Sequence, residues 1–202
     1  MLRIYEWGQK TILTRLSIIN EDFKSFQSNN PIEHIMTRMK APESIASKLR
    51  TMNLEITAEN AKNHVKDIVG VRIICPFNKD IYCLTDMLKS MPDIRVLNEQ
   101  DYVGNPKPSG YRSFHLNVEI PVYRLGGIES VPVGIQVRTA AMDFWATLEH
   151  KVKYKYEGQV PKHLGDELAI CADKISELDN RMYLIHDTIS LINQDSQDSQ
   201  DR

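Results

Sequence analysis

The sequence lacks the features that would place the chain in a membrane or in a secretory pathway. It has no run of about eighteen apolar residues, the length that a membrane-spanning helix needs. Its first residues also lack the basic start, apolar centre and small-residue cleavage site of a secretory signal. We therefore expect a cytoplasmic protein.

Cysteine is scarce, and neither sign of charge predominates. Cys75, Cys83 and Cys171 form no Cys-x-x-Cys motif and no Cys/His pair at zinc spacing, so we expect buried free thiols rather than a disulfide or zinc framework. The 25 Lys and Arg residues nearly balance the 27 Asp and Glu residues, for a net charge of -2. Because such a chain has no overall attraction for polyanions, any polyanion site must be a local basic cluster.

The composition that is present is typical of one globular domain. Of the 202 residues, 42% are hydrophobic and 26% are charged, which suits a chain with one sizeable core. We expect an N-terminal packing or oligomerisation helix over 1–29, a main domain over 30–157, a C-terminal helix over 158–193 and a tail over 194–202. The tail repeats Asp-Ser-Gln, a low-complexity pattern that predicts disorder.

Hydrophobic periodicity predicts long helices at both ends of the chain. Apolar residues recur at steps of three and four in the N-terminal segment, at Ile12, Leu16, Ile19, Phe23 and Phe26. The C-terminal segment keeps this step for about four heptads, at Leu164, Leu168, Cys171, Ile175, Leu178, Met182, Ile185, Ile189 and Ile192. So long an apolar seam needs a partner, which is either the chain's own N-terminal helix or another subunit.

The middle of the chain has the pattern of an α+β fold. Helices are expected near 42–50 and from Thr57 onward, ahead of the first clear strand, Ile68–Cys75. A helix over 80–88 and strands near 94–97, 114–122 and 131–137 follow. This order predicts a mixed β-sheet flanked by helices. The Gly- and Pro-rich segment 102–110 should form an exposed, partly mobile loop between strands.

Basic residues gather ahead of the first predicted strand. Four of them surround a predicted helix start, namely Arg38, Lys40, Lys48 and Arg50. With Ser44 they form either a solvated basic face or an anion site. Arg72 favours the anion site, because an arginine inside so apolar a strand needs a carboxylate, an anion or a base as its partner. Asp67, at the start of this strand, is either a turn residue or an oxygen ligand for Mg²⁺.

A second polar group follows the predicted loop. After Lys107, the segment Gly110-Tyr-Arg-Ser-Phe-His115 offers an aromatic plate, a phosphate-binding guanidinium and hydrogen-bond donors. Alternation should place Tyr111, Ser113 and His115 on one face, where His115 is either a site residue or a satisfied core histidine. The next strand and helix add Gly134, Gln136, Arg138, Asp143, Glu149 and His150. Of these, Gly134, Gln136 and Arg138 share one strand face.

Taken together, these residues resemble the RelA/SpoT-type (p)ppGpp synthetase domain. The matching motifs run in order from about residue 30 to 156, and are Asp67–Ile74, Asp101-Tyr102, Pro106-Lys107, Gly110–Ser113 with His115, Ile135–Thr139 and Phe144–His150. Several motifs in order are more specific than any one of them. Without hydrolase, TGS or ACT regions, the chain is similar to the single-domain small alarmone synthetases, and most to the RelP type. The resemblance implies a fold related to the polymerase-β-like nucleotidyltransferases and a homotetramer assembled through the terminal helices.

The resemblance also implies an activity of the stringent response and a set of residue roles. Enzymes of this family transfer the pyrophosphate of ATP to the 3′-hydroxyl of GDP or GTP with Mg²⁺. For ATP it implies Arg38 and Arg72 around adenine, Lys40, Ser44 and Lys48 at the phosphates, and Glu149 as a nearby buried acid. Asp67 would bind Mg²⁺. For GDP or GTP it implies Lys107, Tyr111, Arg112, Ser113, His115, Gln136, Arg138 and Asp143, with Tyr111 stacking on guanine.

The sequence departs from the family pattern at Gly134. The family has Val-Glu-Ile-Gln-Ile-Arg-Thr here, and its glutamate is the second metal contact and general base. Because losing a base lowers a rate by about two to four orders of magnitude, we expect this copy to be catalytically crippled, by an engineered or a natural substitution. Gln100 is a lesser departure, since a basic residue often precedes the Asp-Tyr pair in relatives.

Two other functions stay open. One is a non-catalytic regulator that keeps the nucleotide pocket as a sensor. The other is an enzyme that pyrophosphorylates the 3′ end of tRNA, for which the available basic surface would be Lys151, Lys153, Lys155 and Lys162.

Overall fold

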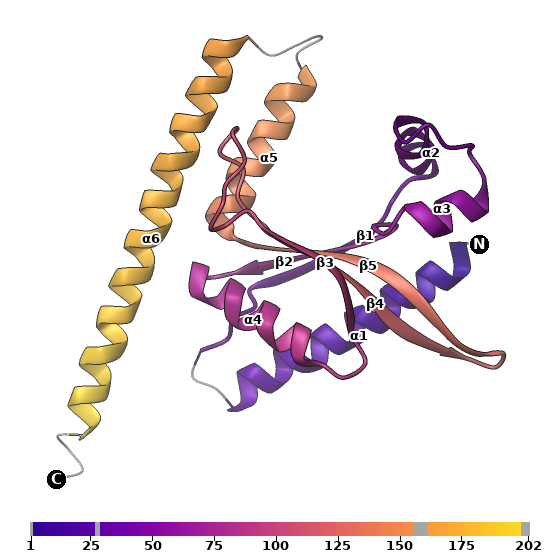
Figure 1. Ribbon diagram of the computed structural model, residues 1–202. Helices are drawn as coiled ribbons and strands as arrows, with labels where there is room; N and C mark the ends of the chain where they lie inside the picture. Colours follow the sequence, from indigo (N-terminus) through magenta and orange to yellow (C-terminus); the bar gives the residue numbers. More distant parts are fainter. Residues whose placement is uncertain (1, 27–28, 156–160, 199–202) are drawn as a thin grey trace.

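A five-stranded mixed sheet organises the chain (Figure 1). The computed structural model describes residues 2–26, 29–155 and 161–198. The strands are β1 (His34–Met39), β2 (Val69–Cys75), β3 (Arg95–Asp101), β4 (Phe114–Arg124) and β5 (Gly127–Thr139). Their spatial order is β1-β2-β5-β4-β3, in which β2 and β5 are parallel and the other neighbours antiparallel. The predicted α+β class with a mixed sheet is confirmed.

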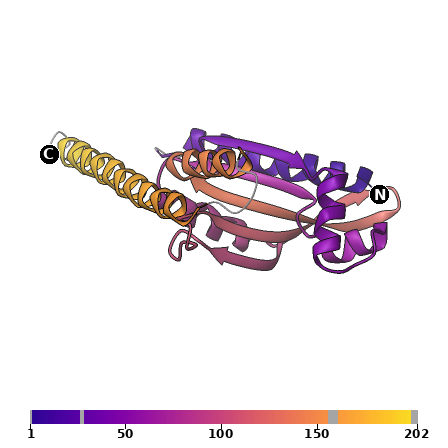
Figure 2. The same cartoon turned by 90° about the horizontal axis from the view of Figure 1, so that it is seen from above.

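Helices cover the two faces of the sheet unequally. The helices α1 (Leu2–Phe26) and α4 (Asn78–Ser90) pack along one face. The other face carries α5 (Ala140–Lys155) near one end, and α2 (Pro42–Thr51) and α3 (Ala58–His64) near the other (Figures 1 and 2). The middle of this second face lies between the two helical arms (Figure 1).

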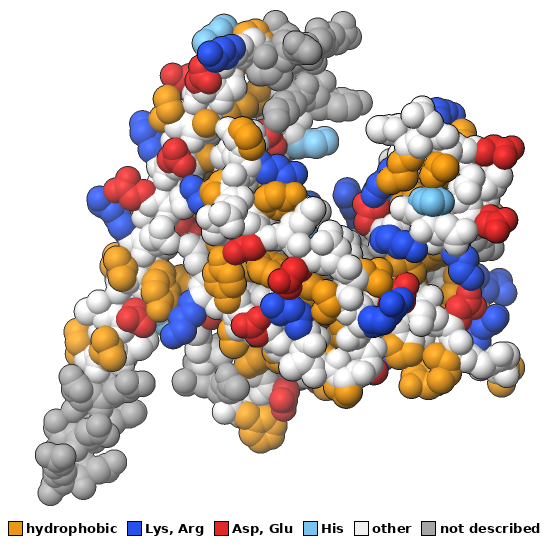
Figure 3. Space-filling model, in the orientation of Figure 1, with side chains coloured by type: hydrophobic (Ala, Val, Ile, Leu, Met, Phe, Trp, Pro, Cys, Tyr) orange, Lys and Arg blue, Asp and Glu red, His pale blue; other side chains and the backbone are white. Residues whose placement is uncertain are grey.

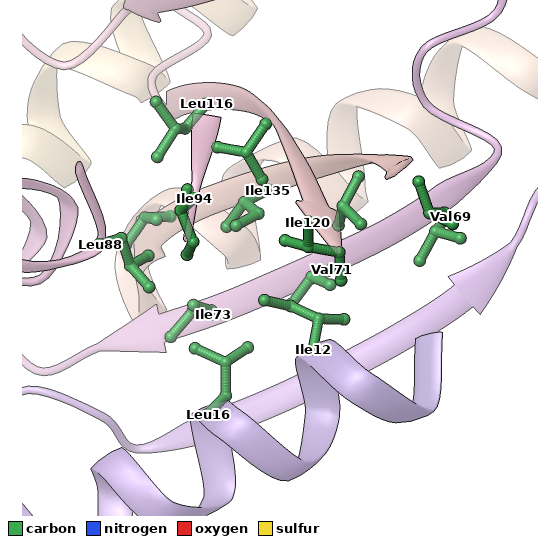
Figure 4. Packing of buried hydrophobic residues seen from close by; sticks show 14 of the residues in the cluster. Ile12, Leu16, Val69, Val71, Ile73, Leu88, Ile94, Leu116, Ile120 and Ile135 are labelled. Atoms are coloured by element: carbon green, nitrogen blue, oxygen red, sulfur yellow. The ribbon is translucent and has the colours of Figure 1, made fainter. Parts of the chain in front are cut away.

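Strand alternation decides which residues form the core and which face the open side. On β2, Val69, Val71 and Ile73 are buried toward α1, where they meet Ile12 and Leu16 (Figure 4). The alternate residues on β2 point the other way. Burying a side chain of this size contributes about 1.5–3 kcal/mol. The core of the sheet therefore lies on the α1 side and leaves the opposite face for polar groups.

The structure corrects the expected start of the sheet. Residues 34–39 form β1, which pairs with β2, so the helices do not all precede the first strand. Arg38 accordingly lies on a strand and not at a helix start. This strand was missed because it lies at the sheet edge and its side chains alternate between exposed and half-buried positions, which leaves no strong apolar run. In contrast, the helix predicted from Thr57 is confirmed, and the Thr57 hydroxyl accepts a hydrogen bond from the Asn60 amide.

The two long helices at the ends of the chain are confirmed, but they do not pair with each other. The helix α6 (Lys162–Asp198) packs on α5, touches α4 and then projects away from the sheet (Figures 1 and 2). Of the two partners that the sequence left open for the seam, packing on α1 is therefore ruled out. Much of the seam is exposed, including Leu178, Met182, Ile185 and Ile189. None of the helices in the described ranges is long and apolar enough to span a membrane.

Two smaller expectations are also corrected. The helix α6 continues to Asp198, past the expected boundary at 193, because a helix that is already formed extends through polar residues at little cost. Residues 199–202 of the predicted disordered tail lie outside the described residues. All three cysteines are free, as expected, but only Cys75 is buried, while Cys83 and Cys171 are exposed.

Candidate active site

A cleft of about 530 Å³ opens on the polar face of the sheet. It lies in the hollow between the α2–α3 arm and the side of the molecule that carries α5 (Figure 3). Its walls contain Met36, Thr37, Arg38, Lys40, Lys48, His64, Lys66, Asp67, Gly70, Val71, Arg72, His115, Asn117, Gly134, Ile135 and Gln136. Five of these are Lys or Arg, so this cleft is the local basic cluster that a polyanion site requires.

At one end of the cleft a carboxylate is held between two ammonium groups. Lys40 Nζ lies 2.5 Å from Asp67 Oδ2, and Lys48 Nζ lies 2.8 Å from Asp67 Oδ1. Burial alone raises the pKa of Asp67, but the hydrogen bonds and charges of the two lysines outweigh it and lower the pKa below its ordinary value. Asp67 is therefore an anion at neutral pH.

This carboxylate suits a divalent cation that is shared with a substrate. Among the described residues, no three His, Cys, Asp or Glu side chains converge on one point. Mg²⁺ is commonly held by one or two carboxylates together with substrate phosphates, rather than by a complete protein cage. Asp67, flanked by two cations that match phosphate oxygens, fits that arrangement.

Arg72, which the sequence places inside an apolar strand, has a carboxylate as its partner. Its Nη1 lies 3.0 Å from Asp143 Oδ1, while its Nε is buried without a hydrogen-bond partner in the described part of the chain. Burial and the nearby charge of Arg138 lower the pKa of Arg72, and the charge of Asp143 opposes them. Arg38, on the neighbouring strand, lies beside Gly70, where a side chain on residue 70 would contact it. Both arginines line the cleft.

Arg138 is the centre of a hydrogen-bonded group at the other end of the site. Its side chain is only 5% exposed and its Nε donates to the Ser113 hydroxyl at 3.3 Å. One terminal nitrogen pairs with Asp143 at 3.1 Å. The other donates to the Tyr111 hydroxyl at 2.6 Å and to Gln136 Oε1 at 3.1 Å. These contacts confirm the placement of Gln136 and Arg138 on one face and fix the Tyr111 ring.

His115 belongs to this group and not to the apolar core. Its Nε2 lies 2.8 Å from the Tyr111 hydroxyl, and its ring meets the Tyr102 ring edge-on. Burial, with the positive charges of Arg138 and Lys107, lowers the pKa of His115 to about 4. At neutral pH His115 is therefore an uncharged hydrogen-bonding group.

The loop between β3 and β4 is tied back onto the helices. Lys107 Nζ lies 4.5 Å from the centroid of the Tyr102 ring and 5.0 Å from that of Tyr111. Arg112 pairs with Asp173 of α6 at 3.3 Å. Gly110 has a φ of +85°, and a Cβ on it would stand 2.4 Å from the Cβ of an alanine on α6. The loop therefore needs glycine here, both for its backbone conformation and for its approach to α6.

Gly134 lies in the floor of the cleft and contributes no side chain there. A Cβ on this residue would lie 3.2 Å from Asp67 Cβ and 3.3 Å from Asn117 Oδ1. Its φ is not in the left-handed region, so the backbone does not demand glycine. The space is limited by these two side chains rather than by backbone strain.

Not every predicted site residue meets the cleft. Ser44 is exposed on α2 and is not part of the cleft wall, and neither is Glu149, which is half-buried on α5. Lys107, Tyr111, Arg112, Ser113, Arg138 and Asp143 border the site through the contacts above rather than lining the cleft itself. Of the basic group considered for tRNA, Lys151 and Lys162 are exposed, and the side chains of Lys153 and Lys155 lie outside the described residues.

Sequence reasoning missed several residues of the cleft wall, including His64, Lys66, Gly70 and Asn117. Two of them follow from strand alternation. Gly70 is two residues before Arg72, and Asn117 is two residues after His115, so each shares a face with a residue that was predicted. His64 and Lys66 come from the end of α3 and the segment after it, where no periodic pattern places a side chain.

Comparisons with known proteins agree with this geometry. Residues 37–159 match the family described as "Region found in RelA / SpoT proteins". The chain is 45% identical over 181 residues to the GTP pyrophosphokinase YwaC of Bacillus subtilis (strain 168), covering 90% of this chain and 86% of YwaC. The small alarmone synthetase 2 of Bacillus subtilis matches with a TM-score of 0.84 and 43% identity over 93% of this chain and 96% of that one. The small alarmone synthetase 1 of Bacillus subtilis, in its structure bound to its product pppGpp, matches with a TM-score of 0.84 and 34% identity, over 93% and 95% of the two chains.

Proposed function

Since the chain belongs to the RelA/SpoT family of small alarmone synthetases, we propose that it transfers the pyrophosphate group of ATP to the 3′-hydroxyl of GDP or GTP. One observation carries this proposal. Asp67 with its two lysines and the group around Arg138 lie at opposite ends of one basic cleft, and His115 and Gln136 join the second group to the cleft wall. Two nucleotides bound at these ends would meet over the floor around Gly134.

The ATP end is assigned to the β1–β2 side of the cleft. Arg38 and Arg72 line it from adjacent strands, and their guanidinium planes are suited to stacking on adenine. The buried, unpartnered Nε of Arg72 is available for a ligand. Lys40 and Lys48 would turn from Asp67 toward the phosphates of ATP, since ammonium groups match phosphate oxygens as point charges. Ser44, on the same helix as Lys48, would add a hydroxyl contact.

The acceptor end is assigned to the Arg138 group. The Tyr111 ring is held by its hydroxyl and offers its face to guanine, and Lys107 stands where it would meet the acceptor phosphates. Asp143 is a fixed carboxylate that would accept hydrogen bonds from the guanine edge. Glu149, half-buried on the same helix, stays assigned to ATP as a nearby acid.

The chemistry requires positioning and charge neutralisation more than covalent assistance from the protein. The 3′-oxygen of the acceptor forms a bond to the β-phosphorus of ATP, the bond from this phosphorus to the bridging oxygen breaks, and AMP leaves with the electron pair. Cationic side chains around the phosphates stabilise the charge that builds up on the transferred oxygens. Mg²⁺ bound at Asp67 would supply further charge neutralisation.

Gly134 removes the side chain that would take the proton of the 3′-hydroxyl. Neither Asp67 nor His115 replaces it as a base, because Asp67 is bound to two lysines and His115 lies in the hydrogen-bonded group of Tyr111. The proton would then leave to solvent. Loss of a general base lowers the rate by about two to four orders of magnitude, so we propose that this copy binds both nucleotides and turns over slowly.

The test is a product assay on the chain and on Gly134→Glu in parallel. Both are incubated with ATP, Mg²⁺ and either GDP or GTP, and the nucleotides are separated by anion exchange. A more anionic guanosine product together with AMP, formed faster by Gly134→Glu, is the expected result. If neither protein forms the product while calorimetry still detects both nucleotides, the chain is a nucleotide-binding regulator, which the bare floor at Gly134 also suits.

The exposed seam of α6 supports a second part of the proposal, assembly into a homotetramer. Four adjacent seam residues, Leu178, Met182, Ile185 and Ile189, are each more than half exposed, at 61%, 53%, 55% and 53%. A stripe of this length on one helix is covered most readily by the same stripe on another copy. Ile185→Asp with Ile189→Asp should lower the mass measured by light scattering, whereas Thr188→Asp, at a polar residue outside the apolar seam, should not. An unchanged mass for the double variant would place the interface elsewhere.

A further inference from the structure

Asn117 stands beside Asp67 across the bare position 134. It pairs in register with Gly134 in the antiparallel β4–β5 ladder, and both residues line the cleft. The point where Gly134 would carry its Cβ lies 3.3 Å from Asn117 Oδ1 and 3.2 Å from Asp67 Cβ. The Asn117 amide oxygen and the first side-chain carbon of Asp67 thus flank one small space on the floor of the cleft.

The surroundings of Asn117 place its side chain on the cleft face of β4. Its strand neighbours Leu116 and Val118 are fully buried on the opposite face, where they build the core. Within the described ranges, the Asn117 amide makes no hydrogen bond to protein. The side chain is half-buried and lines the cleft, so its polar atoms are available to a bound ligand.

We propose that Asn117 is a second oxygen donor of the reaction site, which with Asp67 holds a divalent cation in the cleft beside position 134. This inference rests on the proposed function, because it assigns a residue to the cation of that same reaction. Amide carbonyl oxygens are suitable ligands for hard cations. An amide takes up no proton at neutral pH, so Asn117 would bind and orient without acting as a base.

The same geometry limits what residue 134 can carry beside Asn117. A side chain on residue 134 would come within 3.3 Å of Asn117 Oδ1, closer than side-chain carbons normally approach, so Asn117 would have to shift. In this chain the oxygen on this part of the floor comes from β4, because β5 carries glycine at this level.

The test measures cation binding directly. Mn²⁺ is titrated into the full-length chain in the presence of a non-hydrolysable ATP analogue, and free Mn²⁺ is followed by electron paramagnetic resonance. The variants are Asn117→Ala, Asn117→Val and Asn117→Asp, with Asp67→Asn as the variant that removes the carboxylate. The matched control is Asn98→Ala, because Asn98 is the partner of Asn117 on β3 but lies outside the cleft wall. Thermal unfolding identifies any variant that does not fold.

Asn117→Ala and Asn117→Val should both weaken Mn²⁺ binding by about tenfold or more, as the loss of a metal-site group commonly does. Asn117→Asp should bind at least as tightly as the parent chain, and Asn98→Ala should match the parent chain. Parent-like Mn²⁺ affinity in folded Asn117→Ala and Asn117→Val would overturn the inference. The product assay is scored separately. A guanosine product together with Asn117-independent Mn²⁺ binding would refute this inference alone, whereas Asn117-dependent binding without product in any variant would support it and refute the transferase proposal.

Discussion

Arg138 donates a hydrogen bond of 2.6 Å to the hydroxyl of Tyr111. This contact joins a nearly buried arginine on β5 to an aromatic ring in the loop between β3 and β4. Because Arg138 also pairs with Asp143, contacts within the protein join the ring, the arginine and the start of α5. The end of the cleft that we propose for the acceptor is thus fixed by these contacts, which lowers the entropy cost of positioning a ligand.

Tyr111→Ala should remove guanine-nucleotide binding and spare ATP binding. Base–aromatic stacking contributes about 1–3 kcal/mol, and the ATP end of the cleft lies on the other side of the floor. Tyr111→Phe is the matched variant, since it keeps the ring and loses only the hydroxyl contacts to Arg138 and His115. It should bind GDP more tightly than Tyr111→Ala. Calorimetry with each nucleotide measures both effects, and equal loss of both ligands would contradict the stacking assignment.

Asp67→Asn should uncouple ATP binding from Mg²⁺. The substitution removes the charge that holds Lys40 and Lys48, and both lysines then become available to phosphate in the absence of metal. ATP affinity measured in EDTA should stay the same or rise, while the gain in affinity on adding Mg²⁺ should disappear. Retention of the full Mg²⁺ effect would show that the metal is held elsewhere.

The effect of Asn117→Ala on product formation should have opposite signs with glycine and with glutamate at position 134. In the parent chain, the substitution removes the oxygen donor and should lower product formation. In Gly134→Glu, the new carboxylate competes with Asn117 for the same space, so Asn117→Ala should raise product formation. Residues in contact commonly couple by about 0.5–3 kcal/mol in such double-mutant cycles. If the effects of Asn117→Ala and Gly134→Glu on product formation are strictly additive, the two side chains do not compete for one space.

Gly110→Ala should destabilise the chain more than Gly127→Ala. Both glycines have positive φ, +85° and +115°, so both substitutions strain the backbone. Only at Gly110 would the new Cβ also clash, at 2.4 Å from Ala172 on α6, whereas nothing lies within 4 Å at Gly127. Strain of this kind costs about 1–3 kcal/mol, and the clash adds to it. Urea unfolding compares the two variants, and equal loss of stability would show that the loop does not press on α6.

Asp179→Asn should stabilise the fold at neutral pH and have less effect in acid. Burial raises the pKa of Asp179, although the hydrogen bond from the Thr139 hydroxyl, at 2.6 Å, opposes it. A carboxyl whose pKa is raised in the fold stabilises it below the unfolded pKa, and this contribution is lost as the pH rises through the folded pKa. Asparagine avoids the cost of a buried charge and can still accept from Thr139. Urea unfolding from pH 3 to 7 measures the difference, with exposed Asp166→Asn on the same helix as the control.

Most of the site was predictable because its residues alternate on strands. Arg72 stood out as a charge in an apolar strand, and Gln136 with Arg138 followed from a period of two. Arg38 was recognised as a candidate although its strand was not, since an edge strand with half-exposed side chains has no strong apolar signal. The ion pairs of Asp143 with Arg72 and Arg138 were not predictable, because they join α5 to two different strands.

The sequence by itself determined the family, the α+β class and the chemical groups of the two ends of the cleft, because local periodicity and motif order are properties of the chain. Only the tertiary structure decided that Asn117 faces position 134, since the register of β4 against β5 depends on where the hairpin between Arg124 and Gly127 turns. It also decided that α6 leaves the sheet with its apolar seam exposed. Packing between distant segments depends on the shape of the whole fold, and no local pattern specifies it.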